Sequence, residues 1–297
     1  MKSKEYETKT DPGMEDTNLY KVRRDGKYQS IVRYSGIGPK VSVPAQIGDK
    51  QIAVIGMSAF LRNVQIEEVI LPEGLLYMGD NAFEGCVHLT SVQFPSTFKQ
   101  MRQNAFKDCG LKTLILPPKL RVIDKHVFEG CMELESVQMG DALERIRIGA
   151  FRGCGKLRTL QLPEGLREIG GRAFAFCTSL ETVELPDTVE RIGRQTFCRC
   201  GMHTLRLSAR LTEIPEEAFA YCENLKEVRL PDGVHTLDKG AFYQTPALEK
   251  IYIPPSVKKF GRDVFGPDTS GLTIVCEEGS EAERYAKKQG IKYETTD

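Results

Sequence analysis

The chain has 297 residues, of which 40% are hydrophobic and 28% are charged, as is typical of a soluble folded protein. Lysine plus arginine and aspartate plus glutamate each number 41, so the net charge is about zero. This balance disfavours nucleic acid as a partner, and the lack of any run of about 18 apolar residues predicts no membrane insertion.

Residues 1–18 read as a polar tail without the apolar segment of an intact secretory signal. Either the protein is cytoplasmic or its export signal has been removed. Residues 19–52 are predicted to form an N-terminal β cap. Within them, "LYKVRRDGKYQSIVRY" at 19–34 predicts two strands around an Asp25-Gly26 turn.

Residues 53–265 repeat with a period of 22 or 23 residues. The shared frame is L-x-x-V/L-x-L-P, then L/V-x-x-I, then A-F-x-x-C. Its alternating start predicts a strand with one buried face, and proline suits the exit of that strand. Ala, Phe, Cys and the next Leu fall at offsets 0, 1, 4 and 7, which predicts a helical turn. The repeated phenylalanines are Phe60, Phe83, Phe106, Phe128, Phe151, Phe174, Phe197, Phe219, Phe242 and Phe265.

One such coil has apolar side chains on its inner side and cannot bury them alone, so the coils must stack and their ends must be capped. We therefore predict an α/β solenoid of about ten coils of 22–23 residues, with short strands and helical turns on the outer side. Residues 266–297 are predicted to form a C-terminal cap. Ser280 and Glu283 give a capping-box signal for a short helix that ends at Gly290.

The frame L-x-x-V-x-L-P-x-x-L-x-x-I-x-x-x-A-F-x-x-C resembles the leucine-rich repeats of the bacterial surface-antigen (BspA-like) type over residues 40–280. "GSEAERYAKKQGI" is also similar to the segment that often closes such proteins. The resemblance implies a right-handed leucine-rich repeat solenoid with a parallel sheet on its concave side. It further implies a cell-surface or secreted protein that binds other proteins or host matrix. "LPDTV" at 185–189 is a repeat element and not a sorting signal, so a cytoplasmic location is the alternative.

Seven cysteines occupy one position of the repeat, and packing, disulfides or a metal site could explain them. Stacked equivalents project side by side and not toward each other, and no histidine shares their position, so we predict a structural ladder in the core and no metal. Cys198 falls outside this position, and we expect it to be exposed. Cys198 and Cys200 then form the spot where oxidation would occur first, but we favour a harmless surface thiol over a reactive one. The ladder comprises Cys86, Cys109, Cys131, Cys154, Cys177, Cys200 and Cys222.

The sequence contains no phosphate-binding loop, H-E-x-x-H motif, nucleophile elbow or C-x-x-C pair. We therefore predict no catalytic residues, no cofactor and no enzymatic activity.

One column of outward residues on the predicted sheet changes character along the chain. It is apolar or amide-bearing from Ile70 to Gln161, and charged or aromatic further on. Arginine and tyrosine are enriched in binding hot spots, so we expect a protein or peptide ligand on this face. An intracellular scaffold could use the same face. A glycan-binding protein is disfavoured, because tryptophan is absent. The candidate contact residues are Gln138, Gln161, Glu184, Arg206, Arg229 and Tyr252.

Overall fold

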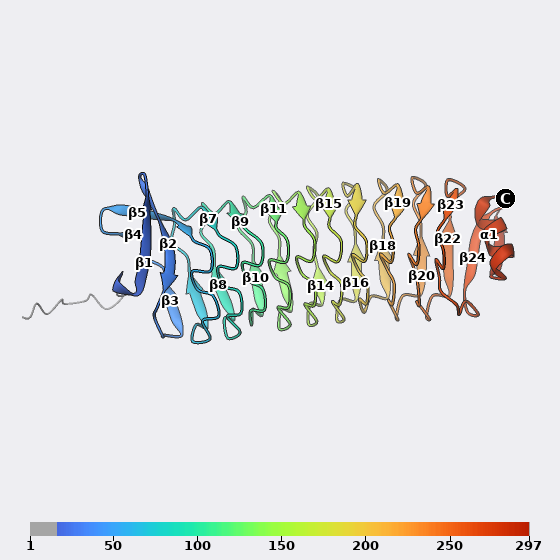
Figure 1. Cartoon of the computed structure of the whole chain (residues 1–297). Helices are drawn as coiled ribbons and strands as arrows, with labels where there is room; N and C mark the ends of the chain where they lie inside the picture. Colours follow the sequence, from blue (N-terminus) through green and yellow to red (C-terminus); the bar gives the residue numbers. More distant parts are fainter. Residues whose placement is uncertain (1–16, 297) are drawn as a thin grey trace, which may run out of the picture.

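The computed structural model describes residues 17–296, which form one elongated rod of stacked coils (Figure 1). The strands β1 (Tyr20–Asp25) and β2 (Tyr28–Tyr34) lie at one end, and the helix α1 (Glu281–Gln289) lies at the other. The predicted solenoid is confirmed. The polar tail expected for 1–18 lies almost wholly outside the described residues.

The main sheet contributes one short strand per coil, and its hydrogen-bonded neighbours run parallel. Equivalent residues of successive coils pair in register, as Glu68 does with Ser91. A repeat of constant length therefore becomes columns of side chains along the rod. The strands are β3 (Lys40–Ser42), β6 (Glu68–Ile70), β8 (Ser91–Gln93), β10 (Thr113–Ile115), β12 (Ser136–Gln138), β14 (Thr159–Leu160), β16 (Thr182–Glu184), β18 (Thr204–Arg206), β20 (Glu227–Arg229), β22 (Lys250–Ile253), β24 (Thr273–Glu277) and β25 (Lys292–Thr296).

A second series of strands comes from the L/V-x-x-I part of the frame, and it also pairs in parallel from coil to coil. Only its last residue is well buried in most coils, because the chain turns away at once. The strands are β5 (Lys50–Ile55), β7 (Tyr77–Met78), β9 (Gln100–Met101), β11 (Val122–Ile123), β13 (Arg145–Ile146), β15 (Glu168–Ile169), β17 (Arg191–Ile192), β19 (Glu213–Ile214), β21 (Thr236–Leu237) and β23 (Lys259–Phe260).

Both ends of the rod carry their own secondary structure. At the N-terminal end a 3-10 helix (Thr17–Leu19) precedes the antiparallel pair β1 and β2, and β4 (Gln46–Ile47) pairs with β5. At the C-terminal end Ser280 accepts a hydrogen bond from the Glu283 N–H, and Gly290 ends α1 in the left-handed conformation. The chain then adds β25 beside β24.

The A-F-x-x-C segment forms consecutive tight turns, and the helical turn predicted there is wrong. In the coil of Phe151, the N–H groups of Gly149, Phe151 and Gly153 donate to carbonyls of the next coil. The intervening N–H groups bond three residues back. Gly149 and Gly153 have positive φ values of 64° and 76°, which a helix does not permit. The segment is thus a third line of hydrogen bonds between coils.

The ten repeated phenylalanines form a continuous column in the core. All are at most 3% exposed, and neighbouring rings are stacked with centroids 4.5–6.1 Å apart. Tyr34 extends the column at one end, 4.9 Å from Phe60, and Tyr285 meets it at the other, 6.2 Å from Phe265. The two ends of the rod therefore close the same core that the repeats share.

Candidate functional site

The seven ladder cysteines are buried, and each thiol donates to a carbonyl of the preceding coil. The acceptor is always the repeated phenylalanine, with Sγ–O distances of 3.1–3.3 Å, as from Cys86 to Phe60 and from Cys154 to Phe128. All nine cysteines of the chain are free thiols. The ladder therefore packs as small apolar groups and also supplies a weak hydrogen bond in every coil.

Burial also makes these thiols poor nucleophiles. Desolvation raises the pKa of Cys131 and Cys177 from 9.0 to about 12, and that of Cys154 well above its ordinary value. Because the thiolate is the reactive form, the ladder is chemically quiet near neutral pH.

Cys198 is 6% exposed, so the expectation that it is exposed is wrong. It lies in a small cluster with Ala175 and Ala220, covered by Tyr221 and Tyr243. The prediction failed because it considered only the coil of Cys198 and not side chains from later coils. Desolvation raises the pKa of this thiol as well.

The main sheet brings the predicted contact residues into one column. Glu184 pairs in register with Arg206, and Arg229 pairs with Tyr252. Gln138 continues the column toward the N-terminal end, opposite Ile115. All of these side chains are exposed except that of Tyr252, which is half-buried.

Two shallow grooves open on this face where the hydrogen-bonded ladder is interrupted. Among the described strands of the main sheet, β8 and β10, β14 and β16, and β18 and β20 are not paired. The two grooves lie at the last two of these interruptions. The first groove has a volume of about 460 Å³ and is lined by Gln161, Glu184 and Arg206, among others. The second, of about 510 Å³, is lined by Arg206 and Arg229. Arg206 thus belongs to both grooves, whereas Gln138 lines neither.

Arg206 is held by neighbours that the sequence analysis did not identify. Arg206 donates to Asp187 at 2.7 Å and to the Leu185 carbonyl at 3.0 Å. The Ala209 N–H and then Arg206 lower the pKa of the Asp187 carboxyl. Asp187 directly follows Pro186 at the exit of the strand. This position in the repeat frame could have indicated a partner for the arginine of the next coil.

Arg229 and Tyr252 lie in direct contact. The Arg229 guanidinium carbon is 3.5 Å from the centroid of the Tyr252 ring, and Nη2 lies 2.9 Å from Glu227. Stacking and ion pairing fix the guanidinium plane while its outer edge faces the solvent. The pair is therefore ordered in advance for a ligand with a carboxylate or carbonyl group.

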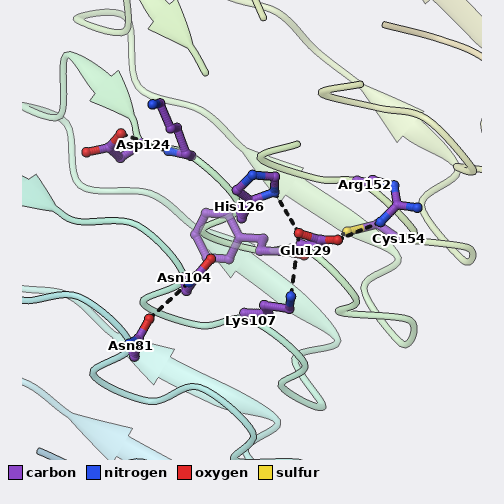
Figure 2. A network of polar contacts seen from close by, with 10 residues as sticks. Asn81, Asn104, Lys107, Asp124, His126, Glu129, Arg152 and Cys154 are labelled. Atoms are coloured by element: carbon purple, nitrogen blue, oxygen red, sulfur yellow. Dashed lines mark hydrogen bonds and ion pairs between the residues drawn. The ribbon is translucent and has the colours of Figure 1, made fainter. Parts of the chain in front are cut away.

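A separate polar network lies on the tight-turn segments of the N-terminal half (Figure 2). The Glu129 side chain is 13% exposed and is contacted by His126 at 2.6 Å, Arg152 at 2.7 Å and Lys107 at 3.8 Å. These four residues come from three successive coils, so the network links coils through side chains.

No group of three or more His, Cys, Asp or Glu side chains suited to a metal ion occurs within residues 17–296. In the same part of the chain, no helix has the length and apolar character needed to cross a membrane.

A model of the BspA type leucine rich repeat region matches residues 53–170 and 144–270, with six copies of the repeat. No curated protein matches the sequence.

Several solved structures are similar to this chain. One is a leucine rich cell surface protein from Faecalibacterium prausnitzii, with 22% identity, 98% of this chain and 100% of that chain covered, and a TM-score of 0.41. Another is a leucine-rich repeat protein from Bacteroides ovatus, with 19% identity and a TM-score of 0.41; the match covers 94% of this chain and 98% of that chain. A third is the pneumococcal vaccine antigen PcpA, with 16% identity and a TM-score of 0.48; the match covers 96% of this chain and 98% of that chain.

Proposed function

Because the chain belongs to the BspA-type leucine-rich repeat family, we propose that it is a non-enzymatic binding module. Its ligand is a protein or peptide, held on the C-terminal half of the main sheet. The fold supports this function because columns of exposed side chains on a rigid array of short strands form an extended binding surface.

The observation that carries the proposal is the alignment of Glu184, Arg206, Arg229 and Tyr252 along two adjoining grooves. Charged and aromatic side chains that are already positioned lose little conformational entropy when a ligand binds. The N-terminal half of the same column carries exposed isoleucines, such as Ile115 at 68%, and offers no comparable set of polar groups.

The setting that we propose is the cell surface, where the protein would act as an adhesin or host-facing binder. The basis is that one similar protein, from Faecalibacterium prausnitzii, is a leucine rich cell surface protein. An intracellular scaffold is the second candidate, favoured by the nine unpaired cysteines, because free thiols persist best in a reducing compartment. Protease treatment of intact cells separates the two: loss of the protein supports the surface, and full protection supports the scaffold.

Binding is tested with the immobilised chain and a panel of purified extracellular-matrix proteins. We expect the double variant Arg206→Glu/Arg229→Glu to weaken the binding of a retained protein by about tenfold or more, because both grooves lose their cations. The matched control is Arg145→Glu/Arg191→Glu, which makes the same charge change on β13 and β17, away from the main sheet.

Retention of the partner by the sheet variant, or an equal loss in the control, would contradict the proposed binding face. If the wild-type chain retains no protein of the panel, the extracellular role is contradicted as well.

A further inference from the structure

A second exposed surface lies on the tight-turn segments of the C-terminal half, away from the main sheet. It is built from the residue that directly precedes the ladder cysteine in three successive coils: Phe176, Arg199 and Tyr221. We call these three side chains the aromatic ridge. We propose that the ridge binds a short protein segment in which a carboxylate lies beside an apolar side chain, independently of the main sheet.

The backbone of all three ridge residues takes the left-handed conformation, which is unfavourable for large side chains. Phe176, Arg199 and Tyr221 have positive φ values of 65°, 60° and 59°. A bulky residue in this left-handed conformation costs on the order of 1–2 kcal/mol, whereas glycine adopts it freely. Three earlier coils place glycine here, at Gly85, Gly130 and Gly153, while Arg62, Asp108 and Gln244 are polar residues that take the same conformation in other coils. Only the ridge puts aromatic rings at this position among the described coils, on both sides of an arginine, which indicates a role for the side chains themselves.

The residues beneath the ridge are small, unlike their equivalents in earlier coils. The position two before the ladder cysteine carries a charged side chain in earlier coils, such as Glu129 and Arg152. Under the ridge it carries Ala175, Cys198 and Ala220, which are buried together. These small residues leave room for Tyr221 to pack down onto them. Phe176 remains 41% exposed, so covering this cluster does not account for its presence.

Arg199 is the group that would recognise the ligand. Its guanidinium carbon lies 4.4 Å from the Tyr221 ring centroid and 5.8 Å from that of Phe176. Within residues 17–296 its side chain makes no hydrogen bond or ion pair. The flanking rings orient the guanidinium plane and shield its faces, so the N–H groups on its edge are available for a bidentate bond to a carboxylate.

The row of cations and rings extends by one coil toward the N-terminus. The guanidinium carbon of Arg152 lies 5.4 Å from the Phe176 ring centroid. Its Nη1 pairs with Glu129, whereas its buried Nε has no hydrogen-bond partner among the described residues. Arg152 thus places a second cation beside the exposed ring, while its buried Nε is not accessible to a ligand.

A groove of about 270 Å³ runs beside the ridge and defines the kind of partner. It is lined by the three ridge residues together with Thr178, Glu223 and Asn224. The Glu223 carboxylate disfavours a polyanion such as nucleic acid, and the exposed rings favour an apolar neighbour of the bound carboxylate. Aromatic residues and arginine are also the types enriched at protein interfaces. A protein segment with alternating acidic and apolar residues fits this composition best.

The test uses the full chain and two synthetic peptides, acetyl-Leu-Glu-Phe-Asp-Leu-amide and the uncharged acetyl-Leu-Gln-Phe-Asn-Leu-amide. The Nε–Hε resonances of arginine are followed by NMR in the ¹⁵N-labelled protein. We expect the acidic peptide to shift the Arg199 resonance in a saturable manner and the amide peptide to bind about tenfold more weakly or less. Arg199→Lys should weaken binding by a similar factor, because lysine lacks the planar pair of donors.

The Phe176→Gly variant separates binding from folding. Because glycine relieves the left-handed strain at this position, the urea midpoint should stay unchanged or rise while peptide binding is lost. Arg145→Gln, on β13 and outside both proposed surfaces, should bind the peptide as the wild type does. An Arg199 resonance that does not move, full binding by Phe176→Gly, or a lowered midpoint of that variant would overturn the proposal. Tighter binding of an oligogalacturonate than of the acidic peptide would also overturn it, in favour of an acidic glycan.

Discussion

At the scale of single residues, the ladder position requires a small buried group that can donate a hydrogen bond. The thiols reach back 25 or 26 residues, to a carbonyl in the preceding coil. The first coil has Asn63 at this position, and its amide donates to the Gly36 carbonyl. A late coil has Thr245, whose hydroxyl donates to the Phe242 carbonyl. The sequence predicted a buried ladder, but the acceptor of each thiol lies in another coil, and its identity depends on how the coils stack.

Cys154→Ala should lower the free energy of unfolding by about 1–2 kcal/mol, because buried contacts and one weak hydrogen bond are lost. The Phe128 carbonyl keeps its bond from the Cys131 N–H and is not left unpaired. Cys198→Ala is the control, since that thiol is buried but donates no such bond to the preceding coil. Urea unfolding measures both, and an equal loss in the two variants would show that the hydrogen bond contributes nothing.

Stability should fall as the pH rises above about 9. The folded pKa of Cys86, Cys131, Cys177 and Cys222 is about 12, against an ordinary value of 9.0. Between these values the folded state binds more protons than the unfolded state, so each thiol costs about 1.4 kcal/mol per pH unit. Below pH 9 these thiols give no pH dependence.

The measurement is the free energy of unfolding between pH 7 and pH 10.5, compared with that of Cys131→Ala/Cys177→Ala. The double variant should show a shallower slope at high pH, by about 3 kcal/mol per pH unit. Identical slopes would show that the thiols do not determine the loss of stability.

At the scale of elements, the frame predicted the strands of the main sheet but misjudged the tight-turn segments. Apolar spacing reports which side chains point inward, and a helical turn and this series of turns share the spacing of Ala, Phe and Cys. The difference lies in the sign of φ. Asn104 and His126, both with positive φ, precede the A/V-F pair. Asn and Gly tolerate positive φ better than other residues, so their presence at this position could have indicated tight turns instead of a helical turn.

The candidate contact residues could be predicted as a column because strand alternation determines which side chains face outward. The grooves could not, because they lie at interruptions of pairing, between β14 and β16 and between β18 and β20, that the residue pattern does not mark. The repeat frame is the same on both sides of each interruption.

The network around Glu129 should contribute more stability than an ordinary surface ion pair. Glu129→Gln leaves Lys107, Arg152 and His126 close together without the carboxylate between them. We expect a loss of about 1–2 kcal/mol, because the carboxylate is largely buried and bonds to several groups. Glu133→Gln, which breaks an exposed pair with Lys156 in the same coil, should change stability little. Equal effects in the two urea titrations would contradict a special role for the network.

At the scale of the whole molecule, the rod is one continuous core with two surfaces that differ from their surroundings. The aromatic column runs from the N-terminal hairpin, through Tyr34 and the ten phenylalanines, to Tyr285 in α1. Each coil buries its apolar side chains only against its neighbours, so the stability of the rod depends on unbroken stacking. This stacking holds the main sheet and the aromatic ridge in fixed positions on one rigid support.

The most direct test of this shared core is a count of thiols with a chromogenic reagent, without reductant, in native buffer and in strong denaturant. The structure predicts that all nine cysteines react in denaturant. In native buffer none should react until the rod unfolds, since every thiol is buried. Fewer reactive thiols in denaturant would reveal disulfides, and rapid reaction of the ladder in native buffer would show that the coils do not share a closed interior.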